Sequence, residues 1–207
     1  MSGPASDTSQ RILDIAEELA QKRGFNGFSY ADIAERLTVT KASLHYHFRS
    51  KADLGCALIE RYRDAFADSL RAIERDVDGA PSKLRRYVAL YDVVMRQDRM
   101  CLCGMLAAEY ATLPEPMQAR LRGFFDANER WLARVLGGGR RAGELAFSES
   151  PRARAARLTS VLEGAMLVAR VYGDGERFNS AARNALADLV TPAPASRAAR
   201  RGGRRIA

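Results

Sequence analysis

The sequence predicts an all-α protein with a small N-terminal helical domain and a larger helical domain behind it. Apolar residues recur at helical spacing through almost the whole chain, and capping residues, prolines and glycines divide this pattern into segments. No segment shows the alternation that is typical of a strand. The 207 residues are 47% hydrophobic and 28% charged, which is enough to bury the core of one large or two small domains.

Four helices are expected in the first third of the chain. A Ser-x-x-Asp capping box, in which the serine oxygen accepts a free backbone N–H at a helix start, occurs at Ser29 and again at Ser50. Thr40 supplies a simpler N-cap, and Gly24 is expected to end the first helix. The four expected helices span residues 8–23, 29–37, 41–47 and 51–75, each within a few residues.

Five more helices are expected in the remainder. Pro114 and Pro116 mark the start of a long one, and the glycine triplet 137–139 is expected to end it. The segment 151–172 is apolar nearly all round, which predicts a helix covered on both sides. The five expected helices lie near residues 84–95, 102–111, 117–136, 151–172 and 177–189.

Composition excludes several classes of protein. No apolar run is long enough to span a bilayer, and the N-terminus has neither a basic start nor an apolar stretch, so no membrane partner and a cytoplasmic location are expected. Three cysteines are too few for a disulfide framework. No nucleophile–base pair with an orienting third residue and no cofactor fingerprint can be named. We therefore expect no catalytic residue, no cofactor, no metal and no enzyme activity.

The positive charge is unevenly distributed. The formal net charge is +8, but residues 191–207 contain five arginines and no acid, which leaves 8 − 5 = +3 for the rest. This segment is too poor in apolar residues to fold, so a disordered basic tail is expected. The expected organisation is a first domain over residues 8–52, a second over 53–190 and the tail over 191–207.

Residues 29–48 have the pattern of a helix-turn-helix, in which the second helix enters the major groove of DNA. At about 100° per residue, Leu44 and Phe48 share the inward face of that helix, and the opposite face carries small, hydroxylated, aromatic and imidazole side chains that suit bases and phosphates. The predicted DNA-contacting residues are Ser29, Thr40, Lys41, Ala42, Ser43, His45, Tyr46, His47 and Lys51. The spacing of these residues alone does not exclude an alternative function, a helical scaffold that binds proteins and does not bind DNA in a sequence-specific manner.

Residues 9–60 resemble the DNA-binding domain of the TetR/AcrR family of bacterial regulators. The resemblance covers about a quarter of the chain. It departs from the family pattern at Thr38, where a glycine is usual, and at His45, where a tyrosine is usual. The residues that carry it are Ile12-Leu13, Ala16, Gly24-Phe25, Phe28-Ser29, Asp32-Ile33-Ala34, Val39, Lys41, Ser43-Leu44, Tyr46, His47-Phe48, Ser50-Lys51 and Leu54.

The resemblance implies a homodimeric, ligand-responsive transcription factor, usually a repressor, that binds double-stranded DNA at an inverted-repeat operator. It also implies an effector pocket in the C-terminal domain, whose last two helices pair with a second subunit. We expect a small apolar or aromatic effector, near Tyr91, Met95, Cys103, Met105, Phe124, Phe125, Trp131 and Met166. The residues expected in the dimer interface are Leu158, Leu162, Ala165, Leu186 and Leu189.

Three other motifs suggest alternatives. His45-x-His47 suggests a metal site, but residues two apart on a helix point about 200° apart, so the two rings would not share an ion. Cys101-x-Cys103 suggests redox sensing, if Arg99 and a helix start lower a thiol pKa, although buried cysteines mostly behave as small apolar residues. Gly137-Gly138-Gly139-Arg140-Arg141 suggests a phosphate loop, but a helix end fits better because no strand precedes it.

Overall fold

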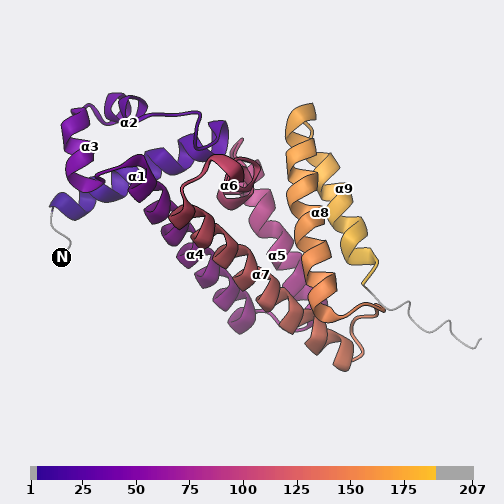
Figure 1. Ribbon diagram of the computed structural model, residues 1–207. Coiled ribbons are helices and arrows are strands. Elements are labelled where there is room, and N and C mark those ends of the chain that lie inside the picture. The colour runs from indigo at the N-terminus through magenta and orange to yellow at the C-terminus, as the bar shows by residue number, and fades with distance from the viewer. Residues whose placement is uncertain (1–3, 190–207) are drawn as a thin grey trace, which may run out of the picture.

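The computed structural model describes residues 4–189, and the predicted basic tail lies outside this range. Over residues 4–189 every regular element is a helix, as the sequence predicts (Figure 1). The elements are α1 (Pro4–Arg23), α2 (Tyr30–Leu37), α3 (Lys41–His47), α4 (Lys51–Asp76), α5 (Ala80–Met95), α6 (Leu102–Ala108), the 3-10 turn η1 (Tyr110–Thr112), α7 (Glu115–Arg141), α8 (Pro151–Tyr172) and α9 (Gly175–Ala187). None of these helices has the length and apolar character that a membrane crossing requires.

Helices α1 to α3 form a head at one end of the molecule, and α4 leads from this head into a bundle made with α5 to α9 (Figure 1). Helices α8 and α9 lie side by side on one flank of the bundle. The buried residues form one continuous cluster that extends from Ile12 in the head to Leu189 after the last helix. The head and the bundle therefore share a core.

The capping signals act as predicted. The Ser29 N–H donates to Asp32 Oδ2 at 2.8 Å, and the Ser29 hydroxyl accepts the Ala31 N–H at 3.2 Å. The same box recurs where the Ser50 N–H donates to Asp53 Oδ2 at 3.0 Å. The Thr40 hydroxyl accepts the Ser43 N–H at 3.3 Å. These caps satisfy backbone donors that α2, α3 and α4 would otherwise leave unpaired.

The expected end of the seventh helix at the glycine triplet is wrong, because α7 continues through it to Arg141. A Cβ on Gly139 would overlap the Ala80 methyl group and lie 2.7 Å from Leu145 Cδ1. Glycine at this position lets the start of α5 and the segment after α7 approach the helix backbone. Tertiary packing thus keeps a poor helix former in the helix.

Other boundaries differ by a few residues. Helix α1 starts at Pro4, ahead of the expected start at residue 8, and α9 runs from Gly175 to Ala187 where residues 177–189 were expected. The expected sixth helix is split, because α6 ends at Ala108 and η1 follows as a separate turn. The start of α9 is set by Asp174, whose side chain accepts the Glu176 N–H at 3.0 Å, an N-cap that the sequence analysis missed.

Thr38 ends α2 in the left-handed conformation, with φ 58° and ψ 43°. A β-branched residue is strained there, and glycine is not. We expect Thr38→Gly to raise the free energy of unfolding by about 0.5–1 kcal/mol, since relief of strain outweighs the extra chain entropy of glycine. Urea unfolding at fixed protein concentration measures this change.

The matched control is Thr40→Gly, two residues away in extended backbone with φ −82°. It removes a cap and relieves no strain, so the free energy of unfolding should fall by a few tenths of a kcal/mol. A Thr38→Gly protein no more stable than the wild type would contradict the strain argument.

Candidate nucleic-acid interface and pocket

Helix α3 presents one polar face to solvent, as its spacing predicts. Leu44 is fully buried against the head, and Phe48 is half-buried. On the opposite side the Tyr46 side chain is 82% exposed, and Lys41 and Ala42 are exposed beside it. An exposed aromatic ring on a helix anchored by a buried leucine has no role in the core, so this face is available to a partner.

The two histidines of α3 have different neighbours. The His45 ring packs against the Tyr30 ring at 4.8 Å between centroids, and its Nδ1 lies 3.2 Å from the Arg49 carbonyl oxygen. The His47 ring contacts the Tyr46 ring edge-on at 5.2 Å. Within residues 4–189 no group of three or more histidine, cysteine or acidic side chains is placed to hold a metal ion.

Tyr30 is a functional residue that the sequence analysis missed. Its hydroxyl lies 2.9 Å from the Phe48 carbonyl oxygen and 2.7 Å from that of Ser50, so it ties the start of α2 to the corner between α3 and α4. Burial raises the pKa of Tyr30 to about 12. Tyr30 therefore fixes the orientation of α3 within the head. The only sequence signal is an aromatic residue directly after the Ser29 cap.

Lys51 is placed differently from the expected phosphate contact. Its ammonium group donates to the carbonyl oxygens of Phe25, at 2.5 Å, and Phe28, and it lies 4.6 Å and 4.4 Å from the centroids of their rings. Burial lowers the pKa of Lys51. The charge is directed into the loop between α1 and α2, so Lys51 acts here as a structural clamp on that loop.

The same loop is held from its other side by the bundle. Glu109, which follows α6, accepts the Phe25 N–H at 2.6 Å and the Asn26 N–H at 3.2 Å. The Asn26 amide also donates to the Thr112 hydroxyl at 2.8 Å. The α1–α2 loop is therefore a joint between the head and the bundle.

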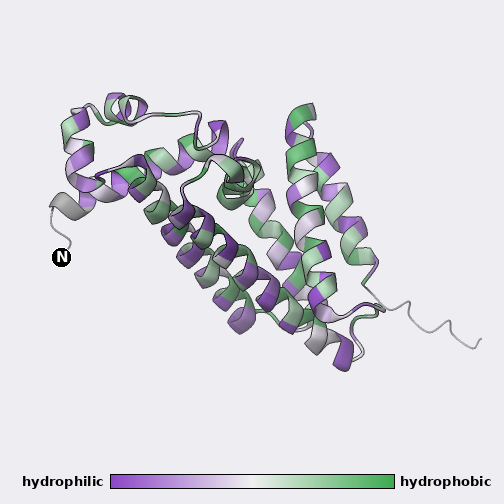
Figure 2. Cartoon of the chain, viewed as in Figure 1, coloured by the Kyte–Doolittle hydropathy of each residue, from purple (hydrophilic) through white to green (hydrophobic). Residues whose placement is uncertain are grey.

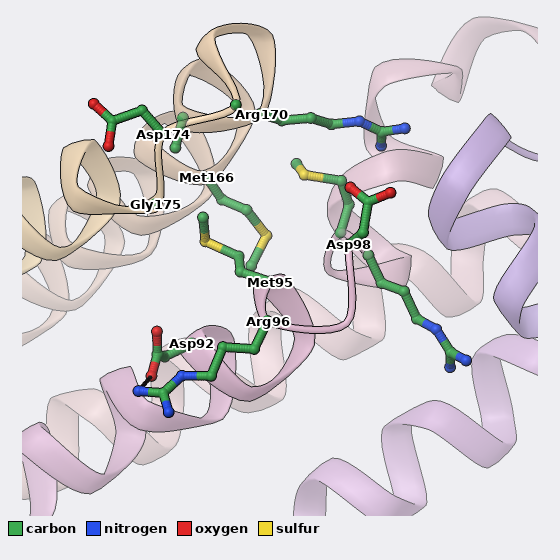
Figure 3. Close-up of a pocket in the computed structure, with 12 residues that line it drawn as sticks. Asp92, Met95, Arg96, Asp98, Met166, Arg170, Asp174 and Gly175 are labelled. Carbon is green, nitrogen blue, oxygen red and sulfur yellow. Dashed lines mark ion pairs between the residues drawn. The ribbon is translucent and has the colours of Figure 1, made fainter.

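A cavity of about 280 Å³ lies between the end of α5, the loop that follows it, the end of α8 and the start of α9. Met95 and Met166 turn toward each other at its centre, whereas Arg170 and Asp174 point outward from its rim (Figure 3). Asp92 and Arg96 form an ion pair at 2.6 Å on one side. The pocket thus combines a flexible thioether floor with a charged rim.

Only two of the expected pocket residues, Met95 and Met166, line this cavity. The expectation is wrong for three aromatic or thiol side chains that are buried in the packed core: Tyr91, Cys103 and Phe124. Trp131 lines a separate cavity between α4 and α7. Met105 and Phe125 are half-buried against the same core. Aromatic rings fill the interior of the bundle, and the cavity that Met95 and Met166 line lies at the helix ends. The charged rim residues carry no periodic signal and were missed.

The cysteines do not have the environment that thiolate chemistry requires. Cys101 and Cys103 are both buried, and burial raises the pKa of each thiol well above its ordinary value. Arg99, expected to lower a thiol pKa, instead lies 3.8 Å from Glu18 in an ion pair. The expected activation of Cys101 or Cys103 by Arg99 is therefore wrong.

Next to these thiols is a buried carboxyl group that the sequence analysis missed. Both carboxylate oxygens of Glu163, on α8, are buried and accept no hydrogen bond from the described residues. A Cβ on Gly104 of α6 would overlap this carboxyl group, so a glycine there makes room for it. Burial raises the pKa of Glu163 to about 7. Glu163 thus titrates near neutral pH.

Three of the expected dimer residues, Leu158, Leu162 and Leu189, are instead buried within the subunit, and Ala165 and Leu186 are half-buried. A different set of apolar side chains, on the outward face of α8, is exposed to solvent. Figure 2 shows the apolar end of α8 that carries them. We call this set the α8 face: Leu167, Val168, Val171 and Tyr172.

The head and its exposed α3 face define a helix-turn-helix protein of the DNA-binding class. Comparison with known proteins gives the family. Residues 12–57 match the bacterial regulatory proteins of the tetR family, and residues 80–185 match the tetracyclin repressor-like C-terminal domain. The chain belongs to the TetR family of bacterial transcriptional regulators.

Individual relatives agree over most of their length. The transcriptional regulator AcuR of Cereibacter sphaeroides is 31% identical over 81% of this chain and 78% of its own. The transcriptional repressor NemR of Escherichia coli K12 is 28% identical over 90% of this chain and 96% of its own. A TetR-family regulator from Agrobacterium tumefaciens has a similar structure, with 32% identity and a TM-score of 0.88 over 90% of this chain and all of its own.

Proposed function

We propose that two copies of the protein bind an inverted-repeat operator in the cytoplasm, repress transcription and release the DNA when a small molecule occupies the α5–α8 pocket. The exposed α3 face carries the proposal, because Tyr46, Lys41 and Ala42 project from a helix that Leu44 anchors. These side chains would enter the major groove. Around them, the residues proposed to contact flanking bases and phosphates are Ser29, Thr40, Ser43, His45 and His47.

The α8 face supports the proposed dimer. Its four side chains lie at positions i, i+1, i+4 and i+5 and thus share one side of the helix. Gly164, one turn before them, has no neighbouring atom within 4 Å of an added Cβ. An exposed apolar face beside a glycine suits close packing against the same face of a second copy.

The pocket supports a small effector with an apolar body and a polar group. Met95, Met100 and Met166 offer adaptable apolar contacts, and Asp98 offers a carboxylate with no hydrogen-bond or ion-pair partner among the described residues. A cavity of about 280 Å³ lies just below the range of roughly 300–1,000 Å³ for small-molecule sites, which favours a small effector.

The test of DNA binding uses Tyr46→Ala with an operator selected from random duplexes by the wild-type protein. We expect binding to weaken by about 1–3 kcal/mol, because a base-contacting side chain is lost. Fluorescence anisotropy at fixed salt measures the affinity, and a duplex with both half-sites scrambled gives the non-specific level.

Tyr46 is 82% exposed, so the thermal midpoint of Tyr46→Ala should match that of the wild type and exclude misfolding as the cause. If Tyr46→Ala binds the selected operator as tightly as the wild type, α3 does not read bases through this residue. If the wild-type protein selects no duplex at all, the scaffold alternative gains support.

A further inference from the structure

The last turn of α1 is attached to the wall of the pocket. The Arg170 guanidinium of α8 donates to the carbonyl oxygen of Gln21, at 3.3 Å, and to that of Lys22. The Met100 N–H donates to the same Gln21 oxygen at 3.2 Å. Arg99 lies 3.8 Å from Glu18, one turn earlier in α1. Arg99, Met100 and Arg170 all line the cavity.

These contacts suit the chemistry of a helix end. The last carbonyls of a helix have no partner within it and carry the negative end of the helix dipole, so a guanidinium group satisfies them. Within residues 4–189 Arg170 forms no ion pair with a carboxylate, and its other hydrogen bond goes to Met105 Sδ at 3.5 Å. The positive charge of Arg170 therefore interacts with the carbonyl groups at the end of α1.

Arg170 lies on α8, which forms one wall of the pocket, so an occupant larger than the cavity would displace this helix. Met166 and Ala169, which precede it on α8, form part of the pocket lining (Figure 3). Helix α1 packs against α2 and supports the helix-turn-helix. A shift of α8 away from α5 therefore moves the guanidinium relative to the carbonyls that it holds, and so loosens the head.

We infer that Arg170 is a positioning residue that transmits occupancy of the pocket to the DNA-binding domain, an inference that rests on the proposed function. In the empty protein Arg170 holds α1, and with it the spacing of the two α3 helices in the dimer, near the 34–36 Å or so that one DNA turn requires. An occupant that separates α8 from α5 favours a conformation in which Arg170 no longer contacts the end of α1. Operator affinity then falls because the two α3 helices lose the required spacing.

The first experiment compares Arg170→Ala with Arg96→Ala in the full-length protein. Arg96 lines the same pocket and carries the same charge, but it pairs with Asp92 and does not contact α1. In Arg170→Ala we expect amide hydrogen exchange over residues 17–24 to rise at least fivefold and operator affinity to fall at least fivefold. Arg96→Ala should change neither by more than twofold. Arg170→Lys, which keeps a donor, should recover part of both effects.

The second experiment fills the pocket covalently, because no effector is identified. Met95→Cys, at the position whose side chain turns into the cavity toward Met166 (Figure 3), is labelled with monobromobimane in a Cys56→Ser background, with and without Arg170→Ala. With Arg170 present the adduct should lower operator affinity at least fivefold, and with Arg170→Ala it should lower it less than twofold. The same loss in both backgrounds would overturn the inference.

The two experiments separate failure of the inference from failure of the proposed function. Unchanged exchange over residues 17–24 and unchanged operator affinity in Arg170→Ala would overturn the role of Arg170. A bimane adduct without effect in the presence of Arg170 would overturn the transmission of pocket occupancy, even if Arg170→Ala alone loosens α1. Failure of the wild-type protein to select any operator duplex would instead overturn the proposed function.

Discussion

Replacing Val171 with glutamate is expected to separate the proposed dimer and to abolish specific binding to the proposed operator. Val171 is 80% exposed and lies at the centre of the α8 face. In a twofold interface the change occurs twice, and each new carboxylate is buried without a partner or forces the interface apart. We expect the dimer dissociation constant to rise by about 100-fold or more, which corresponds to roughly 3 kcal/mol. Analytical ultracentrifugation measures it.

Val93→Glu is the matched control, because Val93 on α5 is 56% exposed and lies outside the α8 face. This protein should remain dimeric and bind the operator like the wild type. Because Val171 is exposed in the single subunit, Val171→Glu should keep the helical content of the wild type. A dimeric Val171→Glu protein would show that the second copy packs elsewhere.

Replacing Glu163 with glutamine is expected to flatten the pH dependence of stability between about pH 4.5 and pH 7. Burial raises the pKa of Glu163 from 4.5 to about 7 in the folded protein. The folded state therefore holds a proton that the unfolded chain has released in this range, so the contribution of Glu163 to stability is fully present below pH 4.5 and is lost as the pH rises to about 7. The full loss is about 3 kcal/mol.

Urea unfolding at several pH values and one protein concentration measures this effect. Above pH 7, Glu163→Gln should be more stable than the wild type, since the amide carries no charge to bury. Tyr62, Tyr91 and Cys101, which face Glu163, have pKa values raised well above their ordinary ones, so they do not titrate in this range. The exposed change Glu35→Gln is the control, and parallel curves for Glu163→Gln and wild type would refute the argument.

The local part of the fold could be predicted because its causes are local. Both Ser-x-x-Asp boxes start helices where the sequence places them, and the period of α3 identifies Leu44 as inward and Tyr46 as outward. Thr38 is a mixed case. The family pattern has a glycine at this position, which indicates an unusual backbone conformation. In the structure Thr38 adopts the left-handed conformation, which glycine adopts without strain.

The rest depends on contacts between segments that are distant in the sequence. An all-round apolar helix such as α8 gives no sign of which side its own subunit covers, so Leu162 was placed in the interface and Val171 was missed. The ammonium group of Lys51 faces the loop that contains Phe25 and Phe28, a contact that no spacing reveals. Likewise, the partners of Arg170 are about 150 residues earlier in the chain.

The joint at the α1–α2 loop has a consequence for chimaeric regulators. Lys51 and Glu109 bind the loop through its backbone, at the carbonyl of Phe25 and the N–H groups of Phe25 and Asn26. A head transplanted at a splice point within α4 brings Lys51 with it but leaves Glu109 behind. A body that receives a foreign head therefore needs a carboxylate at the position of Glu109 to restore the two backbone contacts on that side of the loop.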